Sequence, residues 1–266
     1  MEITLAQGIA LTVMAIILGV DFWLEALFIF RPIIVCTITG IILGDVQTGL
    51  IAGGLTELAF AGLTPAGGTQ PPNPVLAGVM TTVLAFTTGS DPKTAIGLAL
   101  PFSILMQYII LFCYSTFSFF MGKADRAAEE ADIKSIIRIN VLLTAIIALL
   151  YGIVVFLSAY VAQDAMKTLV ESMPSWLTHG FEIAGGILPA VGFGMLLKVM
   201  LKTQYVPYLI VGFFIATFIP ISNLLPVAVI GAALAIHSYY KPKDTVSAAA
   251  STANVIVKGD DFNAGI

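Results

Sequence analysis

The chain has little charge. Asp, Glu, Lys and Arg make up 11% of its 266 residues, against about 25% in an ordinary soluble domain. Hydrophobic residues account for 58%, and the mean hydropathy is +0.99. Uncharged stretches run from 94 to 122, from 139 to 163 and from 203 to 240, each longer than the roughly 20 residues that a spanning helix needs. We therefore expect an all-α integral membrane protein that crosses the bilayer several times.

Other scarcities exclude whole functional classes. The two cysteines, Cys36 and Cys113, each lie alone in an apolar stretch, so we interpret them as buried hydrophobic residues. The sequence holds no Ser/His/Asp grouping, no cluster with metal-ligand spacing and no phosphate-binding loop of the Walker type, which predicts no catalytic residue, no metal and no cofactor. A net charge of −4 argues against nucleic acid as a partner.

Three segments have the length and composition of spanning helices. They cover 94–121, 139–162 and 207–240; Pro101 is expected to kink the first, and Pro220 and Pro226 to divide the third into one span and a broken second element. The charge run "GKADRAAEEADIKSIIR" at 122–138 predicts a solvated helical hairpin, which we place in the cytoplasm because Lys and Arg collect there. We expect a membrane domain over 1–240 and a polar, disordered tail over 241–266.

Residues 3–90 and 181–205 have a different pattern. Acidic and basic residues or clustered Gly and Pro interrupt their apolar runs, and Asp45 in "LGDVQTG" is typical of a turn or helix cap. Non-helical backbone at membrane depth persists only where protein or a wet cavity surrounds it. We therefore predict re-entrant hairpins and broken helices in both regions.

The two regions share a short stretch of similar sequence. "IAGGLTELAFAGL" at 51–63 aligns with "IAGGILPAVGFGM" at 183–195. Paired interrupted segments in two halves of a chain are typical of transporters with an inverted repeat, and their positions indicate the substrate site. Glycine is common in membrane helices, so chance remains the alternative explanation.

The stretch "GGLTELAFAGLTPAGGTQPPNP" at 53–74 holds most of the candidate site. Its prolines prevent a helix through the middle, and its glycines allow a close approach of the backbone. We predict two short apolar arms around a polar turn. Hydroxyls, amides and backbone groups in such a turn suit a sugar, whose hydroxyls both donate and accept; the turn residues proposed to bind it are Thr64, Gly67, Gly68, Thr69, Gln70 and Asn73.

Glu57 lies on the arm that leads into this turn. A carboxylate at membrane depth is costly and indicates a functional site, where it would accept hydrogen bonds from sugar hydroxyls; the alternative is a structural partner for Arg31 or for free backbone donors. Asp21 and Glu25 share one helical face, which indicates an interface or a partner subunit, with substrate contact as the alternative. Glu182 precedes the second IAGG and is a candidate for the same cavity.

The segment "FRPIIVCTITGIILGDVQTGLIAGGLTELAFAGL" at 30–63 resembles the membrane-embedded enzyme IIC of the mannose-type phosphotransferase system. The RP, LGD-x-x-TG and GG-x-x-E elements carry the resemblance, with "HGFEIAGGILPAVGFGMLLKVM" at 179–200 as the second glycine-rich segment; it extends over about 1–240. "DFWLEALFIFRP" and "AGLTPAGGTQPPNP" are most similar to the branch specific for N-acetylgalactosamine, with galactosamine as the close alternative.

The resemblance implies a transport subunit of the bacterial inner membrane, without an enzymatic step of its own. Its membrane partner would be enzyme IID, in a trimer of IIC–IID heterodimers, and cytoplasmic IIB, charged by IIA, would phosphorylate the sugar. An elevator-like core holding both glycine-rich segments would move against a scaffold. For the acetamido group the candidates are Gln70 or Asn73 and Phe60.

Two other classes remain open. An ion-coupled sugar transporter would use the same hairpins, with Glu57 or Asp21 carrying a proton, and would deliver unmodified sugar. A non-transporting membrane scaffold or receptor would keep its complex, and Glu57→Gln would leave sugar uptake unchanged.

Overall fold

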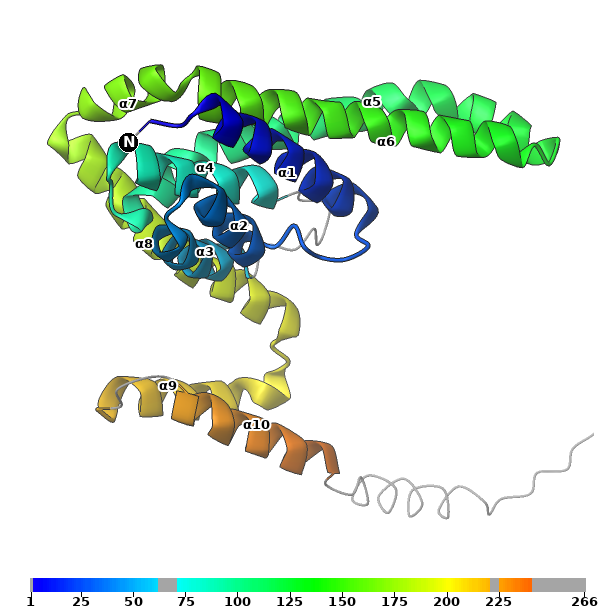
Figure 1. Ribbon diagram of the computed structural model, residues 1–266. Helices are drawn as coiled ribbons and strands as arrows, with labels where there is room; N and C mark the ends of the chain where they lie inside the picture. The colour runs from blue at the N-terminus through cyan, green and yellow to red at the C-terminus, as the bar shows by residue number, and fades with distance from the viewer. Residues whose placement is uncertain (1, 62–70, 221–224, 241–266) are drawn as a thin grey trace, which may run out of the picture. The chain divides into compact units, whose positions relative to one another are not determined.

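A computed structural model describes residues 2–61, 71–220 and 225–240, and every regular element in these ranges is a helix (Figure 1). The all-α class is thereby confirmed. The chain divides into two compact units, residues 1–200 and 201–266, which are described separately. Four helices of the first unit are long and apolar enough to cross a membrane, namely α1, α5, α6 with its continuation, and α8.

The described residues of the first unit form eight α-helices and one π-helix. In order they are α1 Leu5–Leu24, α2 Pro32–Leu43, α3 Val46–Phe60, α4 Pro74–Thr88, α5 Pro92–Glu129, α6 Ile133–Val155 with its π-helical continuation Phe156–Val161, α7 Gln163–Glu171 and α8 Ser175–Met200. Proline occupies the first turn of α2, α4 and α5, where its missing N–H costs no hydrogen bond.

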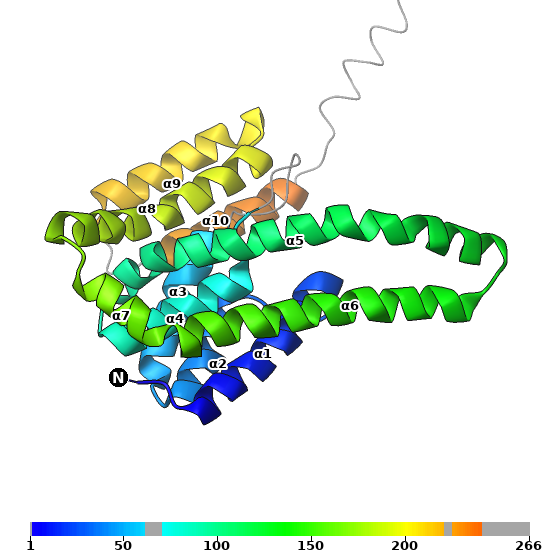
Figure 2. The ribbon, with the colours of Figure 1, turned by 90° about the horizontal axis from the view of Figure 1, so that it is seen from above.

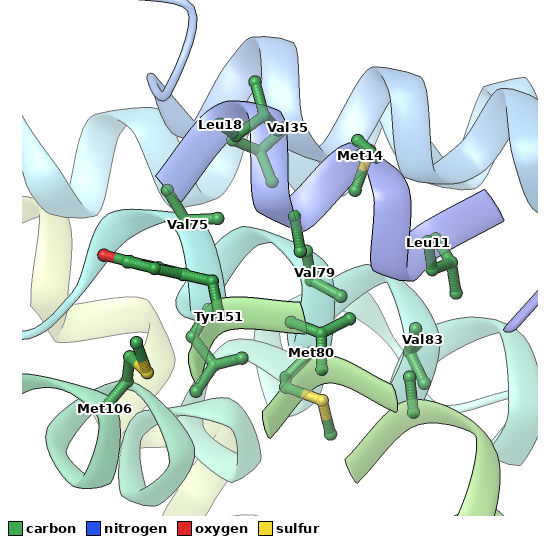
Figure 3. Packing of buried hydrophobic residues seen from close by; sticks show 14 of the residues in the cluster. Leu11, Met14, Leu18, Val35, Val75, Val79, Met80, Val83, Met106 and Tyr151 are labelled. Atoms are coloured by element: carbon green, nitrogen blue, oxygen red, sulfur yellow. The ribbon is translucent and has the colours of Figure 1, made fainter. Parts of the chain in front are cut away.

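Helix α4 lies at the centre of this unit. Nearly all of its residues are buried, and it contacts α1, α2, α3, α5 and α7. Figure 3 shows Val75, Val79 and Met80 of α4 in one packed cluster with Leu18 of α1 and Tyr151 of α6. A helix that is apolar all round is stable only when neighbours enclose it. The arm that follows the polar turn is therefore held at the core of the unit.

Helices α2 and α3 form a tight hairpin. Gly44 ends α2 with φ of 84°, and the Asp45 carboxylate accepts a 3.0 Å hydrogen bond from the Thr48 amide at the start of α3. The prediction of Asp45 as a cap is thus confirmed. The helices have 12 and 15 residues, fewer than the roughly 20 needed to span a bilayer, in agreement with a re-entrant hairpin.

Helices α5 and α6 form a long antiparallel hairpin that extends beyond the helices packed on its base (Figures 1 and 2). The described structure confirms the helical hairpin predicted over 122–138, because α5 runs to Glu129 and α6 begins at Ile133. The first spanning prediction was too short at its charged end, and α5 passes through Pro101 as a helix.

The predicted interruptions are wrong in two places. Helix α8 is continuous from Ser175 to Met200 despite Pro189, and two of its glycines, Gly185 and Gly192, are sites of close packing rather than breaks. Helix α1 is likewise unbroken over 20 residues, because Asp21 lies in its last turn and accepts hydrogen bonds from the loop that follows. The short α2, α3 and α4 agree with the prediction for the rest of 3–90.

The second unit contains a 3-10 turn at Thr203–Tyr205, α9 Val206–Phe218 and α10 Leu225–Tyr240, and α9 contacts α10. The predicted division near Pro220 is confirmed, since α9 ends just before it and Pro226 lies in the first turn of α10. The predicted tail, 241–266, lies outside the described residues.

Candidate functional site

The candidate site centres on an ion pair between α2 and α3. The Arg31 Nε donates to Glu57 Oε1 across 2.8 Å, and Nη2 donates to the same oxygen. The other carboxylate oxygen accepts from the Ile33 amide at 3.2 Å. Glu57 therefore closes the N-terminus of α2, where the helix dipole favours a negative charge. The structural contact that the sequence offered as one alternative for Glu57 is confirmed.

This pair keeps capacity for a ligand. A guanidinium has five N–H donors, and the two bonds to Glu57 use two of them. The Arg31 side chain is 44% exposed and that of Glu57 21%. The pair can thus offer both a charged donor and a charged acceptor to neighbouring sugar hydroxyls, and such bonds are stronger than neutral ones.

Asp21 organises the loop that leads to Arg31. Its Oδ1 accepts from the Leu27 amide at 2.7 Å, and its Oδ2 accepts from the amides of Ile29 at 2.7 Å and Phe30 at 3.3 Å. Asp21 is 6% exposed, so the expected surface role at an interface is wrong for this residue. This positioning role was not predicted from the sequence, where the available signal is a carboxylate at a helix end followed by a short loop before a proline.

Asn73 fixes the far end of the polar turn. Its Oδ1 accepts from the Leu76 amide at 3.0 Å and caps α4, while its Nδ2 donates to Tyr151 Oη across 2.5 Å. Its backbone N–H donates to the Ser103 carbonyl, and the Ser103 hydroxyl donates to its carbonyl. These bonds engage both ends of a fully buried amide. Asn73 therefore positions the turn, and its contact with sugar stays a prediction.

The remaining candidates fall in three places. Phe60 is buried against Ala59, Ala77 and Leu188, so it joins α3, α4 and α8. Glu182 is exposed on α8 with its carboxylate 3.3 Å from His179 Nδ1, and none of the described hydrogen bonds links it to Glu57. The turn residues predicted to contact the sugar lie outside the described residues: Thr64, Gly67, Gly68, Thr69 and Gln70.

The two IAGG segments use the same packing arrangement. A Cβ at Gly53 would lie 3.1 Å from the carbonyl oxygen of Ile33, and one at Gly185 would collide with that of Lys93. Each carbonyl belongs to the second residue of a helix that begins with proline, whereas the glycine after each contact faces open space. The similar sequences thus mark equivalent helix crossings, although an inverted repeat stays a prediction.

The described residues contain no group of three His, Cys, Asp or Glu side chains that would hold a metal ion. Cys36 and Cys113 are free and buried, which confirms their interpretation as apolar residues. The site as described offers hydrogen-bonding groups and one ion pair, which suits the binding of a polar, uncharged ligand.

Comparison with known proteins finds a family model that matches most of the chain. Residues 5–237 match the family model of the sorbose-specific IIC component of the phosphotransferase system. N-acetylgalactosamine permease IIC component 1 of Escherichia coli strain K12 is 61% identical over 265 residues, which cover 100% of this chain and 99% of that protein.

Two solved structures share the fold. One, described only as a membrane protein, is 28% identical, covers 91% of this chain and 98% of its own, and has a TM-score of 0.80. The other is the cryo-EM structure of the mannose transporter ManYZ in complex with microcin E492, with 29% identity, 92% and 99% coverage, and a TM-score of 0.57.

Proposed function

Because the chain belongs to the sorbose-type family of phosphotransferase IIC components, we propose that it carries N-acetyl-D-galactosamine across the bacterial inner membrane. The chain is a membrane transport subunit, and phosphoryl transfer is performed by other subunits of the system. The observation that supports this sugar is the 61% identity, over the full length, to a permease named for it. Galactosamine is the alternative substrate.

The sugar binds where the α2–α3 hairpin meets the start of α4. Arg31 and Glu57 offer a charged donor and acceptor there, and Asn73 anchors the end of the turn whose groups read the sugar hydroxyls. The proposed contacts in that turn are Thr64, Gly67, Gly68, Thr69 and Gln70. Phe60 packs near the acetamido methyl group, and Glu182 of α8 completes the set.

As a component of the phosphotransferase system, the chain works with other components of that system. Its membrane partner is enzyme IID, in a trimer of heterodimers, with IIA and IIB supplying the phosphoryl group in the cytoplasm. The likeness to ManYZ, a transporter solved as a complex, supports a membrane partner. We assign 1–240 to the membrane domain, with the hairpin, α4 and α8 in a core that moves as an elevator, and 241–266 to a tail.

The test uses membrane vesicles that contain this chain and its IID partner. They receive IIA, IIB, the general phosphotransferase proteins, phosphoenolpyruvate and labelled N-acetylgalactosamine, with and without a protonophore. We expect sugar phosphate to accumulate, to require phosphoenolpyruvate and to be unaffected by the protonophore. Unlabelled galactosamine and unlabelled mannose are then added separately as competitors, and their inhibition of N-acetylgalactosamine uptake measures the specificity for the sugar.

Two outcomes would contradict the proposal. Free sugar that accumulates only while the proton gradient is intact would identify an ion-coupled transporter. An assembled complex that moves none of these sugars would identify a scaffold or receptor.

A further inference from the structure

The end of the α5–α6 hairpin holds a cavity of about 430 Å³ that is separate from the sugar site. Three cationic side chains line it, Lys123 and Arg126 from α5 and Arg138 from α6. Its apolar wall includes the large side chains of Phe120, Ile139 and Leu142, together with Ala127. One cavity thus combines a cationic part with an apolar part.

The position of this cavity follows from the pattern of charge along the two helices. The uncharged stretches 94–122 and 139–163 both end at it, so α5 and α6 leave the apolar layer at the same level. Helix α5 has 38 residues and is about 57 Å long, well beyond the roughly 30 Å of a hydrocarbon core. The cavity therefore lies at the membrane surface, with its apolar wall on the hydrocarbon side.

Its cations are available for an anionic ligand. No described ion pair involves Lys123, Arg126 or Arg138, and the chain is described throughout this hairpin. Of the two carboxylates in the lining, Asp132 is occupied as the cap of α6, accepting 3.2 Å and 2.6 Å bonds from the amide and hydroxyl of Ser135. The three cations therefore share the lining with two carboxylates, Glu130 and Asp132, and that of Asp132 is already bonded to Ser135.

The outer surface of the hairpin end also suits lipid. Ile133 and Ile137, on the first two turns of α6, are 68% and 57% exposed and alternate with Lys134 and Arg138. Helices that lie against a membrane surface combine large apolar side chains with Lys and Arg in this way. A hairpin end surrounded by water would gain nothing from exposing these isoleucines.

We propose that the cavity binds an anionic phospholipid, with the phosphate between Arg126, Arg138 and Lys123 and an acyl chain along Phe120, Ile139 and Leu142. Basic pockets between membrane helices on the cytoplasmic side bind phosphate headgroups, and the four Lys and Arg residues of 122–138 favour that side for this hairpin end, because Asp and Glu contribute little to orientation. The apolar wall favours a lipid over a free anion. This site is independent of the sugar that the chain carries.

The test measures bound lipid on the purified complex of the full chain with its membrane partner. Native mass spectrometry after equilibration with phosphatidylglycerol or phosphatidylcholine gives the occupancy of each. We compare Arg138→Gln with Lys134→Gln, since each removes one positive charge from the same loop and only Arg138 lines the cavity. We expect phosphatidylglycerol affinity to fall about fivefold in Arg138→Gln, as one cation near an anionic surface contributes, and to stay unchanged in Lys134→Gln.

Four results would overturn the proposal. An equal loss of phosphatidylglycerol affinity in both variants would show that only net charge matters. Equal binding of the two lipids would show that the site does not require an anionic headgroup. Competition by inorganic phosphate alone would identify a small-anion site. Loss of IIB binding in Arg138→Gln with lipid retention unchanged would identify a protein docking surface. Thermal unfolding of both variants confirms that they remain folded and assembled.

Discussion

Asn73 and Tyr151 form a buried hydrogen bond of 2.5 Å that joins the end of the polar turn to α6. The Tyr151 ring is fully buried and packs so closely on α1 that a Cβ at Gly19 would collide with it. The same asparagine caps α4. One side chain therefore connects the end of the turn to α4 and to α6, far along the sequence.

Removal of this bond is expected to destabilise the protein without changing its charge. Tyr151→Phe leaves the Asn73 amide with a buried unsatisfied donor, which costs about 1–3 kcal/mol. Asn73→Ala also removes the cap of α4 and is expected to cost about 1 kcal/mol more. Thermal unfolding of the purified complex measures both. Equal midpoints for Tyr151→Phe and the unmodified chain would contradict a structural role for the bond.

Substitution of Asp21 is expected to lower transport through the loop that it holds. Asn retains one acceptor oxygen where three backbone amides donate to the carboxylate, so Asp21→Asn frees the loop before Arg31. We expect uptake to fall by roughly tenfold or more, as happens when a binding group is misplaced. Vesicle uptake of labelled sugar measures this loss.

Glu25→Gln provides the matched control. Glu25 lies one turn further along the chain, at the exposed C-cap of α1, and also loses one negative charge. Sugar uptake by the Glu25→Gln variant is expected to remain unchanged. If both variants lost uptake equally, the effect would come from charge at the membrane surface rather than from the loop.

Two pairs of glycines on α8 test whether glycine is needed there for close packing or for backbone flexibility. Alanine at Gly185 would meet the Lys93 carbonyl oxygen, and alanine at Gly192 would lie 2.8 Å from that of Ala59, whereas Gly186 and Gly194 face open space. We expect Gly185→Ala and Gly192→Ala to destabilise the protein by about 1–3 kcal/mol. Gly186→Ala and Gly194→Ala are expected to be neutral or stabilising by up to about 1 kcal/mol. Thermal unfolding of the four variants compares the pairs, and a uniform loss would instead indicate a need for flexible glycine.

The helix caps and the hairpin between α5 and α6 were predictable because their signals are local. Asp45 before a helical stretch and the charge run at 122–138 need only neighbouring residues for interpretation. The glycines of 181–200 were misread because glycine both breaks helices and permits close helix crossings, and the distinction depends on the facing backbone, such as the carbonyl of Lys93 at Gly185.

The candidate site was predictable only in part. The pairing of Arg31 with Glu57 was one of two alternatives, since the sequence shows that both are polar residues at membrane depth but not whether they meet. The bond from Asn73 to Tyr151 joins residues 78 positions apart, and neither carries a sequence signal for the other. The role of Asp21 depends on how the following loop turns back onto it.

Glu57 is proposed to contact the sugar in addition to its ion pair with Arg31, and Glu57→Gln tests this contact. A hydrogen bond to a charged group contributes about 1.5–3 kcal/mol, so we expect binding of N-acetylgalactosamine to weaken by roughly 10- to 150-fold. The matched control is Asp45→Asn, which removes a carboxylate from the same hairpin at its turn, where Asp45 caps α3.

The measurement that tests this most directly is equilibrium binding of labelled N-acetylgalactosamine to the purified complex of each variant with its membrane partner. We expect a large loss of affinity in Glu57→Gln and nearly unchanged affinity in Asp45→Asn. Unchanged affinity in Glu57→Gln, with only a lower unfolding temperature, would show that this carboxylate holds the hairpin together and does not bind the sugar.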